Sequence, residues 1–271
     1  MHLKSVAQLA AMATLIAMSA VFSAAAPATG KSVVDLASYA DALRRFVTPA
    51  GQVRYAALKA DPVTLDAFLA GLAAGDPGGL ATLPDADRIA FWINAYNAIT
   101  LKTIITNYPI HASGFSALRY PASSIRQISG AWSNRDWTVL GAKMSLEDIE
   151  HKTLRKQFKE PRVHMALVCA ALGCPVLRQE PYQGERLGGQ LDEQARRYLA
   201  STAGLVVEFD RGRIAISAIF KWFTADFAAA GGVRTFLTRY APESARAAIA
   251  DEHTRITYLD YDWALNEAQG D

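Results

Sequence analysis

Two cysteines and a histidine lie close together in the segment VHMALVCAALGCP, residues 163–175, and they are the strongest candidates for chemistry in the chain. The pattern predicts a short buried strand over residues 163–169, followed by a tight bend over residues 170–175. A thiol at the end of a strand lies near unpaired backbone N–H groups, which favour the reactive thiolate. Cys169 is therefore a candidate nucleophile, and His164 is a candidate base.

The spacing of these residues leaves several interpretations open. His164 lies five residues before Cys169, and an odd separation on a strand points two side chains to opposite faces, so their pairing requires the strand to break first. Cys169 and Cys174 can also form a structural disulfide across a tight loop, or both thiols can be buried and inert. A thiol–disulfide carrier is less well supported, because such motifs usually have two residues between the cysteines, and here there are four.

A second histidine, His151, lies on a helix that we expect over residues 145–158. The helix begins with Ser145-Leu-Glu-Asp148, which has the Ser-x-x-acid form of a helix start. Glu147 and His151 are four residues apart, as are His151 and Arg155, so each pair can meet on one helix face. Either this face is a row of solvated charges, or His151 is a general base that a carboxylate orients.

The most apolar long segment of the chain after residue 25 is predicted to be a central core helix over residues 85–108. Asp85 or Asp87 can cap its start, and Pro109 closes it. Asn94 and Asn97 lie three residues apart near its middle, as neighbours on the helix surface. Because an unpaired buried amide costs on the order of 1–3 kcal/mol, we expect both side chains to have hydrogen-bond partners.

The sequence predicts no metal centre and no cofactor. Two histidines and two cysteines could in principle ligate zinc, but the spacing of His151, His164, Cys169 and Cys174 matches no standard zinc pattern. The sequence contains no glycine-rich loop of the kind that binds phosphates or dinucleotides, and it contains no GxSxG motif. Lys and Arg number 28 and Asp and Glu number 26, so the net charge of +2 gives no electrostatic case for a nucleic-acid partner. We expect a small-molecule or peptide ligand.

The first 25 residues are typical of a secretory signal peptide. Lys4 supplies the positive charge, residues 6–22 are almost entirely apolar, and Ser23-Ala24-Ala25 offers small residues for cleavage. An uncleaved membrane anchor is the alternative, but the apolar run is slightly short for one. We expect a linker over residues 26–32 and a periplasmic or secreted protein that meets a membrane only through the signal segment before cleavage.

The remaining pattern predicts an α+β fold in a single globular domain over residues 33–271. It is predominantly helical and packed on a small, mostly antiparallel sheet. Further helices are expected over residues 33–47, 63–74, 190–200, 218–229, 233–240 and 242–250. Further strands are expected over residues 137–144, 205–209, 213–216 and 255–259, and loops over 75–84 and 111–134.

Five segments, in order, resemble the bacterial members of the domain of unknown function 547: FWINAYNAITLKTII, SLEDIEHKTLR, PRVHMALVCAALGCPVLR, ISAIFKWFTADF and ITYLDYDWALN. The resemblance extends over about residues 55–266. It implies that the recurring blocks of the family include Asn94, Tyr96, Asn97, Glu150, His151, Arg155, Arg162, His164, Cys169, Cys174, Pro175, Phe220 and Trp222. It also implies that plant members carry Ser in place of Cys174 and keep the first cysteine, so a shared role would fall to Cys169. Some members are fused to a glutaredoxin domain, which associates the family with thiol chemistry.

Two hypotheses follow for the function. The first is a thiol-dependent hydrolase or acyl transferase, in which Cys169 is the nucleophile, His164 or His151 the base, and Glu150 or Asn94 the group that orients the base. The residues expected around the substrate are then Tyr96, Asn97, Arg155, Arg162 and Cys174, with the two arginines holding an anionic group. The second is a non-enzymatic periplasmic binding or interaction domain, with a structural polar network and bridged or inert cysteines.

Overall fold

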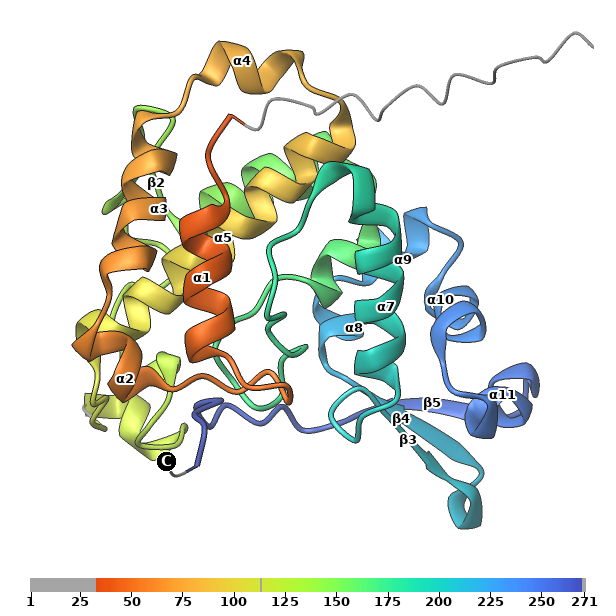
Figure 1. Ribbon diagram of the computed structural model, residues 1–271. Coiled ribbons are helices and arrows are strands. Elements are labelled where there is room, and N and C mark those ends of the chain that lie inside the picture. Colours follow the sequence, from red (N-terminus) through yellow and green to blue (C-terminus); the bar gives the residue numbers. More distant parts are fainter. Residues whose placement is uncertain (1–32, 113, 270–271) are drawn as a thin grey trace, which may run out of the picture. The chain divides into compact units, whose positions relative to one another are not determined.

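Helices make up most of the computed structural model, which describes residues 33–112 and 114–269 (Figure 1). These residues lie within one compact unit, Ser32–Asp271. The α-helices of the described residues are α1 (Ala37–Phe46), α2 (Tyr55–Ala60), α3 (Val63–Ala74), α4 (Pro77–Thr82), α5 (Asp85–Asn107), α6 (Arg155–Gln157), α7 (Leu187–Leu199), α8 (Ile219–Trp222), α9 (Thr224–Ala229), α10 (Val233–Tyr240) and α11 (Glu243–Ala250). The predicted signal peptide 1–25 and linker 26–32 lie outside the described residues.

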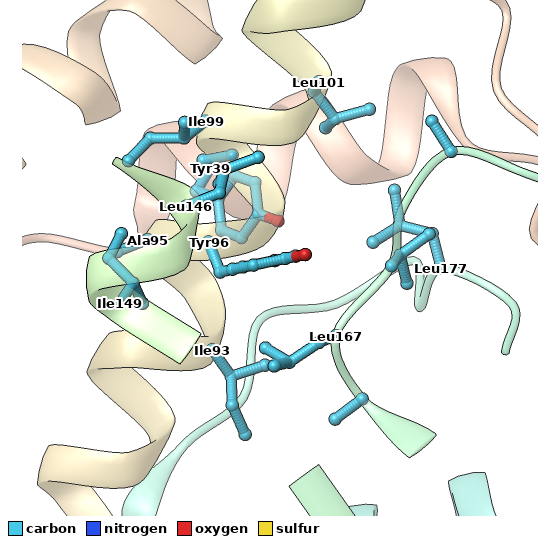
Figure 2. Close-up of a cluster of buried hydrophobic side chains, with 14 of the residues drawn as sticks. Tyr39, Ile93, Ala95, Tyr96, Ile99, Leu101, Leu146, Ile149, Leu167 and Leu177 are labelled. Carbon is cyan, nitrogen blue, oxygen red and sulfur yellow. The ribbon is translucent and has the colours of Figure 1, made fainter. Parts of the chain in front are cut away.

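The helix α5 is the centre of the larger of two apolar clusters, as its composition predicts. Most of its residues are buried, and it packs against α2, α3 and α7. Figure 2 shows Tyr96 projecting from α5 among apolar side chains that include Ile93, Leu146 and Leu167. The helix ends where Tyr108 becomes extended before Pro109, because a proline disfavours helical backbone in the residue before it.

Two small sheets complete the α+β fold, and the predicted fold class is confirmed. The strands are β1 (Trp137–Val139), β2 (Ala142–Met144), β3 (Leu205–Glu208), β4 (Arg213–Ile216) and β5 (Arg255–Tyr258). Strands β1 and β2 pair antiparallel, as do β3 and β4, whereas β5 pairs parallel to β4. In Figure 1 the three-stranded sheet lies near α10 and α11, and α11 contacts β4. A second apolar cluster fills this part of the molecule.

The strand predicted over residues 163–169 is wrong. Pro161–Met165 forms a short 3-10 helix instead, because Pro161 suits a first helical position and the Glu160 carboxylate accepts a hydrogen bond from the Arg162 backbone N–H at 3.1 Å. The loop predicted over residues 75–84 also contains a helix, α4. Its start is stabilised by Asp76, whose carboxylate accepts hydrogen bonds from the backbone N–H groups of two glycines.

The helix predicted over residues 145–158 is present but wider than an α-helix. Ser145 and Asp148 exchange hydrogen bonds between side chain and backbone, each at 3.1 Å, so the predicted helix start is confirmed. Asp148–Leu154 then forms a π-helix that continues into α6. Single π-helical turns are frequent at functional sites. In the part of the chain that the structure describes, no helix has the length and apolar character needed to cross a membrane.

Candidate functional site

A cavity of about 230 Å³ gathers several of the residues that the sequence singles out. Both cysteines line it, together with Glu150, His151 and His164. Its walls are largely aromatic and are formed by Tyr96, Trp132, Trp222, Phe223, Tyr261 and Trp263. The cavity therefore combines sulfur, imidazole and carboxyl groups with flat apolar surfaces, which is the usual make-up of a small-molecule site.

The two cysteines are joined in a disulfide, with their Cα atoms 6.3 Å apart. Of the interpretations left open by the spacing, the structure therefore shows the bridged one. Cys169 is the more exposed partner, and Cys174 is buried. The Cys174 Sγ accepts two hydrogen bonds of 3.0 Å, one from the Cys169 backbone N–H and one from the Tyr261 hydroxyl. The same hydroxyl lies 3.3 Å from the Cys169 Sγ.

The bend between the cysteines is held by the chain's C-terminal segment. Leu172 and Gly173 donate backbone hydrogen bonds of 2.8 Å to residues 264 and 262, and Asn266 donates one of 3.1 Å to Ala170. Gly173 is required for this approach, because a Cβ there would lie 2.9 Å from the Asp262 backbone nitrogen. Ala170 has a φ of 59°, a left-handed conformation that is strained for a non-glycine residue. Such strain immediately after Cys169 is typical of functional sites.

His164 is almost fully buried and is oriented by a carboxylate that the sequence analysis did not single out. Its Nε2 donates a 2.7 Å hydrogen bond to Asp226, and its ring stacks on Phe223 with a centroid distance of 3.8 Å. Burial lowers the pKa of His164 to about 4, and the hydrogen bond to Asp226 offsets only part of this effect. The ring is therefore neutral at pH 7. Its Nδ1 carries the free lone pair and has no hydrogen-bond partner among the described residues.

Arg155 fixes the position of Asp226. The guanidinium forms a two-point ion pair with the Asp226 carboxylate at 2.6 and 3.0 Å, and it also contacts the Nδ1 of His151 at 2.9 Å. Burial raises the pKa of Asp226, but Arg155 and His164 outweigh it and hold that pKa below its ordinary value. Asp226 is therefore ionised and links Arg155 to His164 in one chain of hydrogen bonds.

Glu150 lies on the other side of the imidazole, on the π-helix. Its Oε1 is 3.9 Å from the Nδ1 of His164, and its carboxyl group also interacts with Tyr96. Burial raises the pKa of Glu150 to about 7, although Arg155 and Tyr96 favour its charged form. A carboxyl with this pKa can donate or accept a proton at neutral pH. The side chain lies within the cavity, but it does not form a direct hydrogen bond to the histidine.

His151 lies at the exposed rim of the cavity. Partial burial and the neighbouring Arg155 lower its pKa, and the nearby carboxylate of Glu147 opposes them. The expected meeting of His151 and Arg155 on one helix face is thus present. Of the two candidate bases, His164 is the one that a carboxylate holds in place.

The two asparagines of α5 act on the backbone and do not line the cavity. The Asn94 amide exchanges hydrogen bonds of 2.8 and 2.9 Å with the backbone of Tyr182. Asn97 donates to the Ala166 carbonyl at 3.0 Å and accepts from the Val168 N–H at 2.9 Å. Asn97 thus holds the segment between His164 and Cys169, and the expectation that both amides have partners is confirmed. The structure does not bring Asn94 to either histidine.

Arg162 also lies away from the cavity. It pairs with Glu160 at 2.5 Å and with Asp192 at 2.6 Å, and it lines a different surface depression. Both arginines expected to hold a substrate anion, Arg155 and Arg162, are therefore already paired with carboxylates.

Sequence reasoning missed several residues that line the cavity: Arg126, Trp132, Phe223, Tyr261 and Trp263. It also missed Asp226, which does not line the cavity but holds His164. They come from segments far apart in the sequence. Asp226 lies in the segment ISAIFKWFTADF, which is one of the five segments that resemble the family. The sequence around a single aspartate on a short helix does not indicate which residue it will contact. Within the described ranges, no group of three or more His, Cys, Asp or Glu side chains is placed to hold a metal ion.

Comparison with known proteins gives one finding. The family described as "Protein of unknown function, DUF547" matches residues 80–199, which include α5, the π-helix, both cysteines and α7. No curated protein and no solved structure matches the chain. The match over residues 80–199 supports the DUF547 family, the one that the sequence segments resemble.

Proposed function

We propose that the protein is a thiol-dependent acyl-transfer enzyme, a hydrolase or transferase, with Cys169 as nucleophile and His164 as base. The observation that carries this proposal is the convergence of the sulfur pair and a carboxylate-held imidazole on one cavity. A nucleophile, a base and a group that orients the base are the three parts that acyl transfer through a thiol requires.

The disulfide makes reduction the first step of this proposal. An external thiolate would attack the more exposed sulfur, that of Cys169, and Cys174 would leave as a thiolate. The Cys169 N–H and the Tyr261 hydroxyl already donate hydrogen bonds to that sulfur, so they would stabilise the departing charge. A second external thiol would then resolve the mixed disulfide, releasing the Cys169 thiol and an oxidised external disulfide.

Acyl transfer by the reduced protein would follow in two halves. The Cys169 thiol gives its proton to His164 and forms a bond to the substrate carbonyl carbon, and the leaving group departs with that proton. Water or another acceptor then attacks the thioester and regenerates the thiol. Asp226 stabilises the imidazolium while it carries the proton, and Arg155 keeps Asp226 ionised. The Glu150 Oε1 lies 3.9 Å from the Nδ1 of this imidazole.

The experiment uses hydrolysis of p-nitrophenyl acetate by the disulfide-reduced and the oxidised protein. Reduced wild type should turn over the ester, and oxidised wild type should not. The Cys174→Ser variant should be active without reductant, because it cannot form the bridge, and it has the residue that the resemblance implies for plant relatives. Cys169→Ser is the matched control and should be inactive. Equal rates for Cys169→Ser and reduced wild type would overturn the proposal.

A second candidate is a periplasmic or secreted binding domain, and the disulfide itself favours it. A bridge at the base of an aromatic cavity can serve to hold the bend in place, with His164 and Asp226 as part of a structural network. Exported proteins keep such bonds in an oxidising compartment. This candidate is supported if neither reduction nor loss of Cys169 changes the ester hydrolysis rate.

A further inference from the structure

The cavity contains one arginine whose charge no carboxylate neutralises within the described part of the chain. Arg126 lines the cavity, and the ion pairs of the described residues leave it without an acidic partner. Its guanidinium donates a hydrogen bond of 2.7 Å to the Tyr120 hydroxyl. Arg155 and Arg162 differ from it, because each is paired with aspartate.

Aromatic rings hold the Arg126 guanidinium in place. Its central carbon lies 4.5 Å from the Tyr120 ring centroid, 5.1 Å from that of Trp263 and 5.5 Å from that of Trp132. The backbone is also fixed, because Ser124 caps the short 3-10 turn Ile125–Gln127 and accepts a hydrogen bond from the Arg126 N–H at 3.2 Å. A guanidinium positioned in this way loses little conformational freedom when it binds a ligand.

We propose that Arg126 binds the oxyanion group of the ligand, and that the apolar part of the same ligand lies against Trp222 and Trp263. The planar fork of an arginine matches the two oxygens of a carboxylate or a phosphate. Trp222 and Trp263 stack with a centroid distance of 5.8 Å and line the same cavity. Glu147 and Glu150 also line it, and ionised carboxyl groups would repel an anion, so Arg126 is the arginine of the lining that attracts the anionic group of the ligand. This inference rests on the proposed function and makes its substrate an acyl compound with a negatively charged group.

The test measures binding of small probes to the oxidised protein by tryptophan fluorescence, since three tryptophans line the cavity. Benzoate and phenyl phosphate carry the two oxyanions on one ring, and benzamide is the uncharged control. At least one anion should bind saturably and more tightly than benzamide, and the preferred anion identifies the headgroup. Arg126→Gln should weaken that binding roughly 10- to 100-fold, as expected for loss of a charged hydrogen-bond partner. Arg119→Gln is the matched control, because Arg119 is exposed on the same loop and does not line the cavity.

Three results would overturn the inference: equal affinity for benzamide and the anions, unchanged affinity in Arg126→Gln, or no saturable binding of either anion. The thermal unfolding temperature of Arg126→Gln must match that of Arg119→Gln, so that weaker binding cannot be attributed to unfolding. Arg126→Lys, which keeps the positive charge, should recover part of the affinity. The assay requires no thiol chemistry. Failure of Cys169 to react would therefore refute the proposed function but not the anion site. Failure of anion binding would refute the anion site but not the proposed function.

Discussion

Replacement of Glu150 by Gln should stabilise the protein at neutral and alkaline pH and change little in acid. Burial raises the pKa of this carboxyl from 4.5 to about 7. Between those values the folded protein keeps a proton that the unfolded chain has released, so the wild-type carboxyl makes folding less favourable as pH rises. The shift of about 2.5 pH units corresponds to about 3 kcal/mol, and Gln removes this cost because it does not ionise.

The neighbouring His164 changes the free energy of unfolding with pH in the opposite direction. Glu150→Gln must therefore be compared with wild type at each pH. The pKa of His164 is lowered from 6.5 to about 4, so its neutral form contributes stability above pH 6.5 that is lost as the pH falls toward 4. Between pH 4.5 and 6.5 the contributions of Glu150 and His164 therefore change in opposite directions. In Glu150→Gln only the histidine contribution remains, so its stability should rise by about 1.4 kcal/mol per pH unit across this interval.

The assay is urea unfolding of the disulfide-intact protein, followed by circular dichroism at pH 5, 6, 7 and 8. The difference between Glu150→Gln and wild type should grow from about 0.8 kcal/mol at pH 5 to about 3 kcal/mol at pH 8. Glu147→Gln is the matched control, since Glu147 is exposed on the same segment. A difference that does not vary with pH would refute the argument that burial controls the protonation of Glu150.

Three further changes test the framework around the cavity by the same unfolding assay at pH 7. Asn97→Ala removes two buried hydrogen bonds to the segment 166–168 and should cost about 2–4 kcal/mol; a cost below 1 kcal/mol would contradict its positioning role. Asp226→Asn breaks the ion pair with Arg155 and should cost about 1–3 kcal/mol, and wild-type stability would count against that link. Gly173→Ala forces the bend away from Asp262 and should cost about 1–3 kcal/mol; an unchanged midpoint would mean that the approach is not close.

Periodic apolar patterns were enough to predict most helices and the fold class. The core helix α5 lies within one residue of its predicted bounds, because both ends carry strong local signals. The strands predicted over residues 205–209 and 213–216 are also present, as the antiparallel pair β3 and β4. Residues close together in the sequence determine these elements, so the elements can be predicted from local sequence patterns.

The strand predicted over residues 163–169 is absent because a side chain takes the place that a neighbouring strand would have. The run VHMALVC has the composition of a buried strand, but Asn97 supplies the hydrogen bonds that a paired strand would give. The partner of His164 was missed for a related reason, since Asp226 lies 62 residues away and only the packing of α9 brings it near. Contacts between residues so far apart in the sequence produce no local spacing pattern from which they could be predicted.

Mass spectrometry of the protein during ester turnover tests the central claim most directly. Reduced Cys174→Ser protein, quenched in acid shortly after mixing with p-nitrophenyl acetate, should carry one acetyl group, and peptide mapping should place it on Cys169. His164→Asn in the same background should slow its formation strongly, because the thiol loses its base. Acetyl groups found only on lysines or the N-terminus, with Cys169 unmodified, would contradict the account.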